Sequence, residues 1–248
     1  MHLQSVPKRI VMRLGGGSLL GASTVLNSER IADCAKIFAR VLRVTDQLVI
    51  VTGGAGAHQF IEVARRFSAS ENTCDKIGSS FCDTLAEIVK ASIELEGEDV
   101  YPVVPRSIEQ VRLGLRQSNC VVVGSLDEPV SSSDSAAAYV AENARADLMV
   151  VVKAWNLRDK LPEDAFCYTS PFSICVAQLN NRTFHLIEKA GARPFFDQIS
   201  LKILQRSATR TALIAIGDLN LLPDWLASNN LESAVELVGI CGRHTSAQ

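Results

Sequence analysis

The stretch Val11-Met12-Arg13-Leu14-Gly15-Gly16-Gly17-Ser18 runs from an apolar segment directly into a glycine turn. A short apolar run closed by glycine is typical of a buried strand, and we expect a strand over Arg9–Leu14. The same order returns at Gln47–Val51, which Thr52-Gly53-Gly54 closes, and again at Cys120–Gly124. Because glycine has no Cβ, backbone N–H groups in such turns can approach an anion closely. Three predicted strands therefore each end in a candidate anion-binding turn.

Helical patterns separate these strands. Apolar residues recur at helical spacing between Arg30 and Leu42, and Asn27 or Ser28 can cap the start of that helix. Further helices are expected over 57–67, 75–96, 107–115, 133–143, 196–207 and 221–228, and further strands over 100–104, 147–153 and 212–216. Strands that alternate with helices of this length predict βαβ units. We therefore expect an α/β fold, a three-layer αβα sandwich with a mostly parallel central sheet.

The domain organisation follows from what interrupts this alternation. We find no internal repeat, low-complexity tract or convincing linker, so one domain over residues 1–248 is expected. It can divide into two lobes, a substrate half to about residue 145 and a nucleotide half after it. The pattern loosens over residues 156–182, where Pro162 and Pro171 act as breakers.

The composition of the chain limits which binding partners and which cellular compartment are expected. With 25 basic and 27 acidic side chains, the chain has no basic surplus for nucleic acid or an anionic membrane. Its seven cysteines contain no CxxC pair, and Cys34 and Cys120 are interpreted as buried apolar residues in a reducing compartment. We recognise no signal peptide and no apolar run of about 18–20 residues that could span a bilayer. A soluble cytoplasmic protein without nucleic-acid or membrane partners is expected.

Common nucleotide-binding motifs are absent from the three glycine turns. Gly15-Gly16-Gly17-Ser18 lacks the Gly-Lys-Ser/Thr of a P-loop, and no turn has the GxGxxG fingerprint. Each turn alone could be a plain tight turn. Three of them after three parallel strands favour one anion-binding crevice at the carboxyl edge of the sheet.

The order of these motifs resembles the amino acid kinase superfamily, and within it the archaeal-type UMP kinases. The resemblance covers most of the chain. It rests on the first strand and its turn, and on the segments Val51–Gly54, Phe60–Arg65, Asp75–Gly78, Val100–Val104, Ser132–Ala138 and Phe196–Ser207. It implies that ATP with Mg²⁺ donates its γ-phosphoryl group to a small phosphorylated or acidic acceptor. The magnesium would be carried by the nucleotide, so no protein metal site is expected. A homo-oligomer (a dimer or hexamer), or a hetero-oligomer with a homologue, is also implied.

The same resemblance implies three groups of site residues. The implied catalytic residues, which would offset or organise charge, are Arg13, Asp134 and Lys202. The residues implied to bind the nucleotide or its phosphates are Gly15, Gly16, Gly17, Ser18, Trp155 and Asn156. Those implied to bind the acceptor are Gly53, Gly54, His58, Asp75 and Ser133.

Several of these positions depart from the family pattern. Arg13 stands where the family usually has a lysine, and His58 where it has an arginine that grips the acceptor phosphate. Asp83 and Leu85 replace an arginine and an asparagine, and Trp155–Asp159 replaces Val-Asp-Gly-Val-Tyr. His58 could instead be a surface or capping residue, although isopentenyl phosphate and fosfomycin kinases place a phosphate-binding histidine here.

Three alternatives therefore remain open. The first is an active UMP-kinase-type phosphotransferase. The second is a non-catalytic relative that binds nucleotide or oxyanion, as the molybdenum storage proteins do, or that partners a catalytic homologue. The third is a kinase for another small phosphomonoester. Asp134 has a further interpretation, because Ser132-Ser133-Asp134 before an alanine-rich run also has the pattern of a helix N-cap.

Overall fold

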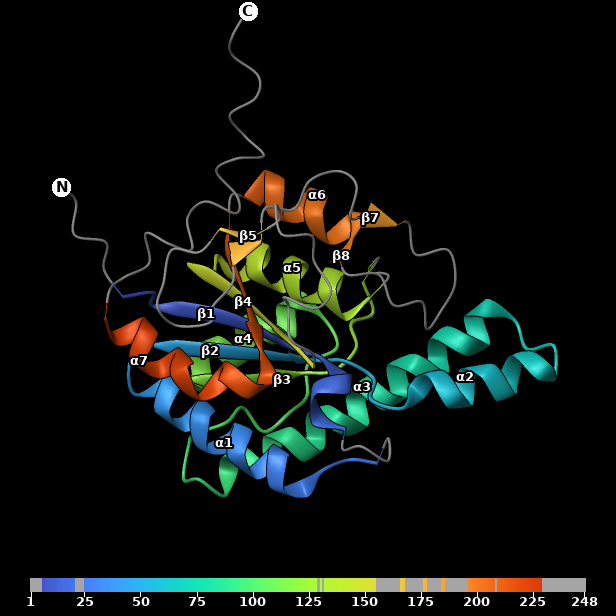
Figure 1. Cartoon of the computed structure of the whole chain (residues 1–248), viewed down its shortest axis with the longest axis horizontal. Helices are drawn as coiled ribbons and strands as arrows, with labels where there is room; N and C mark the ends of the chain where they lie inside the picture. The colour runs from blue at the N-terminus through green and yellow to red at the C-terminus, as the bar shows by residue number, and fades with distance from the viewer. Residues whose placement is uncertain are drawn as a thin grey trace, which may run out of the picture.

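Five parallel strands form the central sheet of the computed structural model, shown in Figure 1. Their order is β3-β2-β1-β4-β9, with the bounds β1 Arg9–Leu14, β2 Gln47–Thr52, β3 Cys120–Val123, β4 Leu148–Lys153 and β9 Arg210–Ala215. All neighbouring strands in this sheet are parallel, so their carboxyl ends lie along one edge. The structure describes residues 6–20, 25–128, 130, 132–154, 166–167, 176–177, 184–185, 196–207 and 209–228.

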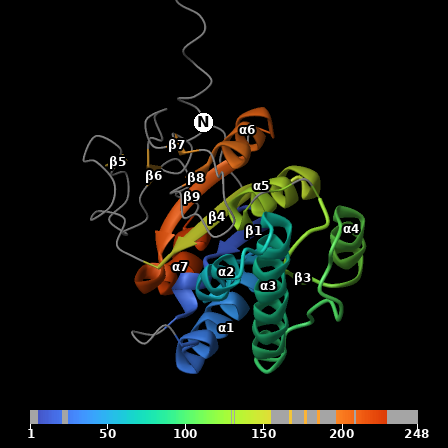
Figure 2. The ribbon, with the colours of Figure 1, turned by 90° about the vertical axis from the view of Figure 1, so that its right-hand side faces the viewer.

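Helices cover both faces of the sheet (Figure 2). One face carries α1 (Ser28–Leu42), α3 (Glu71–Glu94) and α7 (Leu222–Ala227), and the other carries α4 (Ile108–Gln117), α5 (Ser133–Ala144) and α6 (Gln198–Ser207). Successive strand residues point to opposite faces: Met12 packs with the first group of helices and Val11 with the second. The predicted three-layer sandwich with a parallel sheet is therefore confirmed.

The remaining elements extend this sandwich. Helix α2 (Ala57–Arg66) packs along the start of α3, and the pair projects from the body of the molecule in Figure 1. Short 3-10 helices lie at η1 (Gly16–Leu19) and η5 (Ile216–Leu221). Two small two-stranded sheets join β5 (Phe166–Cys167) to β6 (Val176–Ala177), and β7 (Phe184–His185) to β8 (Phe196–Asp197).

Some predicted boundaries are wrong for local reasons. The strand predicted over Val100–Val104 forms only a single bridge, between Val100 and Cys120. Pro102 has no N–H to donate to a ladder, which explains why the pairing stops there. Helix α3 begins four residues earlier than predicted, because Ser70 caps it by accepting a hydrogen bond from the Thr73 N–H.

Helix α5 places functional side chains over the sheet. Its start is fixed by a capping box, in which the Ser132 hydroxyl accepts from the Ser135 N–H and the Ser135 hydroxyl from the Ser132 N–H. The buried alanines of the helix, Ala136, Ala137, Ala138 and Ala141, let it pack closely on β1 and β4. Ser133 and Asp134 therefore begin a helix that lies directly against β1.

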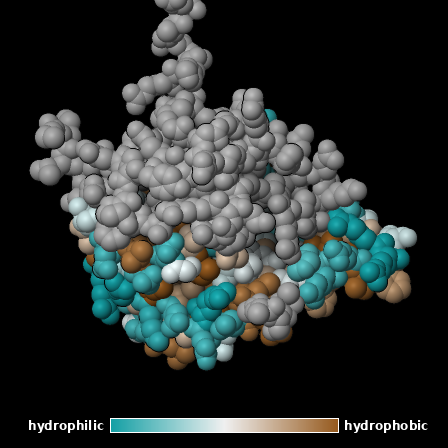
Figure 3. Space-filling model, viewed as in Figure 1, coloured by the Kyte–Doolittle hydropathy of each residue, from teal (hydrophilic) through white to brown (hydrophobic). Residues whose placement is uncertain are grey.

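The described surface is mixed in character. On the face in Figure 3, hydrophilic residues cover much of the described part, with hydrophobic residues scattered between them. Within the described ranges, no helix combines the length and the hydropathy that a bilayer crossing requires.

Candidate functional site

Two of the three glycine turns meet at the carboxyl edge of the sheet. The Gly53 N–H donates to the Leu14 carbonyl at 3.0 Å, and the Gly15 N–H donates to the Val152 carbonyl at 3.3 Å. A Cβ on Gly16 would lie 2.5 Å from the Ala55 nitrogen and 2.7 Å from the Gly53 oxygen. Only glycine allows this backbone approach, so the turns after β1 and β2 form one unit.

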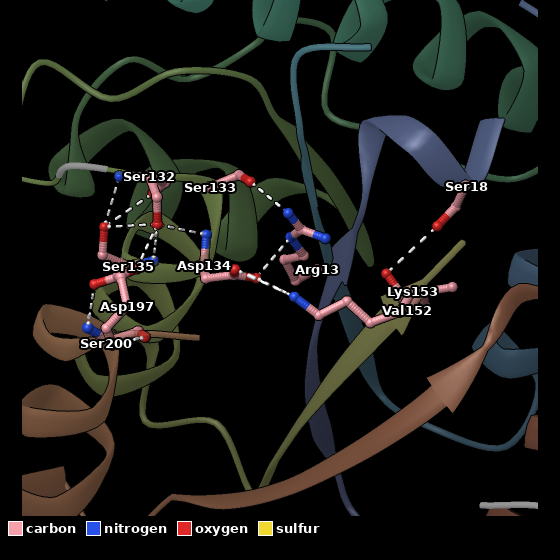
Figure 4. A network of polar contacts seen from close by, with 10 residues as sticks. All are labelled: Arg13, Ser18, Ser132, Ser133, Asp134, Ser135, Val152, Lys153, Asp197 and Ser200. Carbon is pink, nitrogen blue, oxygen red and sulfur yellow. Dashed lines mark hydrogen bonds and ion pairs between the residues drawn. The ribbon is translucent and has the colours of Figure 1, made fainter. Parts of the chain in front are cut away.

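Arg13 extends from β1 toward the start of α5 (Figure 4). Its Nη2 donates to the Ser133 hydroxyl at 2.9 Å, and its Nε lies 2.9 Å from Asp134 Oδ1. The second contact is an ion pair rather than a hydrogen bond, because Arg13 Nε has no partner at hydrogen-bonding angles. A Cβ on Gly15 would lie 2.5 Å from Arg13 Nη1, so the guanidinium passes directly beside the first glycine turn.

Lys153, the last residue of β4, is a second cation at the same carboxylate. Its Nζ lies 3.3 Å from Asp134 Oδ2 and 3.4 Å from Oδ1, and only 6% of the residue is exposed. Burial lowers the pKa of Lys153 to about 8; Asp134 opposes this shift, and the charge of Arg13 adds to it. Lys153 is not among the site residues that the sequence predicts. The signal that could have identified it is a lone charged residue at the end of an otherwise apolar strand.

These three side chains form a cluster with an excess of positive charge. Asp134 is 4% exposed and neutralises one of the two cations, Arg13 and Lys153, with which it is paired. A further buried carboxylate, Asp197, lies nearby and accepts hydrogen bonds from the Ser132 hydroxyl at 2.5 Å and the Ser200 N–H at 2.9 Å. Its charge also acts on Lys153, whose pKa it raises. The arrangement suits a ligand that brings negative charge to the glycine turns.

The N-cap geometry is compatible with both interpretations of the Ser132–Asp134 segment, and the catalytic role of Asp134 stays a prediction. Ser132, and not Asp134, caps α5, which leaves the Asp134 carboxylate directed at Arg13 and Lys153. Ser18 is fully buried, and its hydroxyl is directed at the Val152 carbonyl at 3.5 Å. Gly17 is less crowded, since a Cβ there would meet only Ala154 Cβ at 3.6 Å.

The predicted acceptor residues lie around the second turn. A Cβ on Gly54 would lie 3.0 Å from the carbonyl of Gly78, which is one helical turn after Asp75 on α3. Asp75 itself is exposed. His58 is half-buried in the first turn of α2, after a left-handed Gly56 at φ 76°. The structure thus brings both helices to the Gly53-Gly54 turn, and the roles of these residues stay predictions.

The structure does not bring the residues predicted for the nucleotide side to the cluster around Asp134. Lys202 is exposed on α6, and among the described residues no ion pair joins it to the Arg13–Asp134–Lys153 cluster. Trp155 and Asn156 lie outside the described residues. Within the described ranges, no group of three or more His, Cys, Asp or Glu side chains could hold a metal ion.

The two departures on α3 have different environments. Leu85 is 2% exposed and packs in the core between α3 and the sheet, which counts against a role for this position in acceptor binding. Asp83 instead lies at the third glycine turn, where Ser125 and Arg106 bind its carboxylate.

Comparison with known proteins places this geometry in a family. Residues 8–156 match the Amino acid kinase family, a span that includes both meeting glycine turns, Arg13, Asp134 and Lys153. The chain belongs to the amino acid kinase family. This assignment confirms the resemblance that the motif order indicated.

Relatives within the amino acid kinase family include uridylate kinases. The uridylate kinase of Methanosarcina acetivorans is 30% identical over 220 residues, covering 88% of this chain and 91% of the relative. That of Methanothermobacter thermautotrophicus is 30% identical over 211 residues, covering 83% and 89%. Among solved structures, uridylate kinase from Archaeoglobus fulgidus has a TM-score of 0.63 at 22% identity, covering 88% of this chain and 95% of that one. UMP kinase from Bacillus anthracis has a TM-score of 0.65 at 15% identity, covering 90% and 93%.

Proposed function

We propose that this member of the amino acid kinase family is an ATP-dependent phosphotransferase of the UMP-kinase type, acting on a small phosphorylated or acidic acceptor. The observation that carries the proposal is a pair of cations, the half-buried Arg13 and the buried Lys153, that share Asp134 beside the two joined glycine turns. The relatives named uridylate kinase support the same class of reaction.

The residues present suit a nucleotide phosphate. At Gly15, Gly16 and Gly53 any Cβ would clash with neighbouring atoms, so the backbone itself lines the turns. ATP would supply the transferable phosphoryl group and, since the described residues offer no carboxylate cage, would carry its own Mg²⁺. The nucleotide would contact four further predicted residues: Ser18, Trp155, Asn156 and Lys202.

Catalysis would rest on positioning and on charge. In phosphoryl transfer, negative charge spreads over the equatorial oxygens of the group in flight, and fixed cations stabilise it. The Arg13 guanidinium would offset this charge from β1 and the Lys153 ammonium from β4. Asp134 would hold both cations in place, and the acceptor's acidic group would bind at Gly53 and Gly54, near His58 and Asp75.

A second candidate is a protein that binds a nucleotide or an oxyanion without transfer. The two cations at Asp134 favour it as much as catalysis, because Arg13 and Lys153 attract an anion in either case. Acceptor-dependent turnover is what separates the two functions.

The test is ATP consumption by the purified chain against a panel of small phosphorylated and acidic acceptors. We expect turnover with at least one acceptor, and Arg13→Gln should lower kcat by roughly 10²–10³-fold, as when one preorganised donor is removed. The fold should survive, because Asp134 keeps Lys153 as its partner. Arg40→Gln, which removes an exposed ion pair between α1 and Asp224 of α7, is the matched control and should leave turnover unchanged. Turnover that Arg13→Gln does not alter would contradict the role of Arg13. Nucleotide binding without turnover for any acceptor would favour the second candidate.

A further inference from the structure

The third glycine turn, at the end of β3, contains a carboxylate of the protein itself. The Asp83 side chain reaches it from α3, and Asp83 Oδ1 accepts from the Ser125 N–H at 2.7 Å and from the Ser125 hydroxyl at 2.8 Å. Thr52 helps to hold α3 there, since its hydroxyl donates to the Cys82 carbonyl at 2.9 Å. The donors of this turn are therefore already used.

A cation completes the environment of this carboxylate. Arg106 Nη1 donates to Asp83 Oδ2 at 2.5 Å. The same guanidinium binds Asp127, through Nη2 at 2.7 Å and Nε at 3.2 Å. A backbone N–H, a hydroxyl and a guanidinium that converge on two oxygens form a donor set that would equally bind a phosphate.

Gly124 shows that this turn is shaped to admit α3. A Cβ on Gly124 would lie 2.7 Å from Asp83 Cα and 2.9 Å from its backbone nitrogen. The space that glycine leaves open is filled by the backbone and side chain of Asp83. Gly124 therefore makes room for a carboxylate of the protein itself, that of Asp83.

The β3 turn lies next to the predicted acceptor turn. Strands β2 and β3 are parallel neighbours with Val51 opposite Val123, so Gly53 and Ser125 follow equivalent points on adjacent strands. Adjacent strands are about 4.8 Å apart, so a small acceptor held at Gly53 and Gly54 would extend to the neighbourhood of Asp83.

We propose that Asp83 is a specificity-determining residue, a built-in anion that occupies the β3 turn and excludes phosphate or carboxylate groups of the acceptor from it. Two carboxylates, Asp83 and Asp127, share the single guanidinium of Arg106, so this group of residues is net negative and repels a further anion. The acceptor class that fits carries its acidic group at Gly53-Gly54 and turns a neutral or cationic part toward β3. This statement about the acceptor rests on the proposed function, whereas the occupied turn does not.

Direct binding of inorganic phosphate to the full chain tests the occupied turn without any turnover. Titration calorimetry should show that Asp83→Ala binds one more phosphate per chain than the wild type, because the Ser125 donors and Arg106 Nη1 become free. Asp127→Ala is the matched control: it also removes a carboxylate partner of Arg106 but leaves Asp83 in the turn, and should add no phosphate site. Adding Arg106→Gln to Asp83→Ala should remove the extra site or weaken it at least tenfold.

Folding is checked by circular dichroism, and Asp83→Asn serves if Asp83→Ala does not fold. The amide keeps an oxygen for the Ser125 donors and removes the charge, so phosphate should bind at least threefold more tightly to Asp83→Asn than to the wild type. Folded Asp83 variants that bind phosphate with wild-type stoichiometry and affinity would overturn the proposal. An equal gain in Asp127→Ala would also overturn it. A chain that transfers no phosphoryl group but gains a phosphate in Asp83→Ala would refute the kinase function and leave the occupied turn standing.

Discussion

At the scale of single residues, burial and ion pairing have opposite effects on the charge of Lys153. Removing an ammonium group from water opposes its charge, and the shared Asp134 only partly compensates because Arg13 is bound to the same carboxylate. The result is a lysine whose pKa lies at about 8, well below the ordinary 10.5. A cation that titrates so near neutrality gives the site a pH dependence that an exposed lysine would lack.

We predict that Lys153→Met changes how stability depends on pH. Between about pH 8 and 10.5 the unfolded chain binds a proton at Lys153 that the folded chain has lost, so the contribution of this residue to the free energy of unfolding rises with pH. Urea denaturation should show the wild type gaining stability relative to Lys153→Met from pH 7 to pH 10, by on the order of 3 kcal/mol over the full window. A difference that stays constant across this range would contradict the shifted pKa. Arg40→Met, which removes an exposed cation, is the control.

A second residue-scale prediction concerns activity. If the charge of Lys153 assists transfer, kcat/KM of the active chain should fall as pH rises through about 8. Lys153→Arg, which stays charged throughout, should abolish this fall while keeping a cation beside Asp134. If kcat/KM of Lys153→Arg fell with the same midpoint pH as that of the wild type, the titrating group would be a residue other than Lys153.

At the scale of elements, the site is made by turns that touch through their backbones. The turn after β1 enters the space beside the turn after β2, and α5 starts at Ser132 so that its first residues face Arg13. The contact between the two turns involves glycine backbone groups, and a helix cap sets the start of α5. Both features depend on backbone geometry more than on side-chain size. Neighbouring glycines of the first turn, Gly16 and Gly17, should therefore differ in how much a substitution destabilises the protein.

We predict opposite outcomes for two alanine substitutions in this turn. In Gly16→Ala the new Cβ would lie 2.5 Å from the backbone nitrogen of Ala55, which cannot move aside as a side chain can. Unfolding should become easier by about 1–3 kcal/mol, and phosphate binding should weaken as the turns separate. In Gly17→Ala the nearest atom would be 3.6 Å away, an ordinary contact, and stability should stay within about 0.5 kcal/mol or rise slightly. Equal effects of the two changes would show that the turns do not meet in this way.

At the scale of the whole molecule, stability comes from a sheet buried on both faces. Val150 faces the cluster of α1, α3 and α7, and its neighbour Val151 faces the cluster of α4, α5 and α6; both are fully buried. A sheet with one solvated face would have only one of two successive residues buried. This two-sided burial fixes the strand ends that carry Gly15, Gly53 and Lys153.

We therefore predict that Val150→Ala and Val151→Ala destabilise the chain to a similar extent. Each removes two buried methyl groups, a loss of about 2–3 kcal/mol once the cavity is included. Thermal and urea unfolding should detect both. Val103→Ala, at a half-exposed position, should change stability by about 0.5 kcal/mol or less. If either Val150→Ala or Val151→Ala left the stability unchanged, one face of the sheet would not be packed.

The sequence by itself determined the five strands of the central sheet, most of the helices around it, and their order along the chain. Apolar runs such as 47–52 and the glycines that end them are local signals, as is the cap at Asn27, so the parallel sandwich could be predicted from them. The closeness of Arg13 to Ser133 and Asp134 was predictable only through the family resemblance, because 120 positions separate Arg13 from Ser133.

Only the tertiary structure decided which charges meet. Lys153 joins Asp134, and Asp83 joins Ser125 and Arg106, because strand order and the approach of α3 bring distant positions together. No local pattern encodes such pairings, since they depend on packing over the whole sheet.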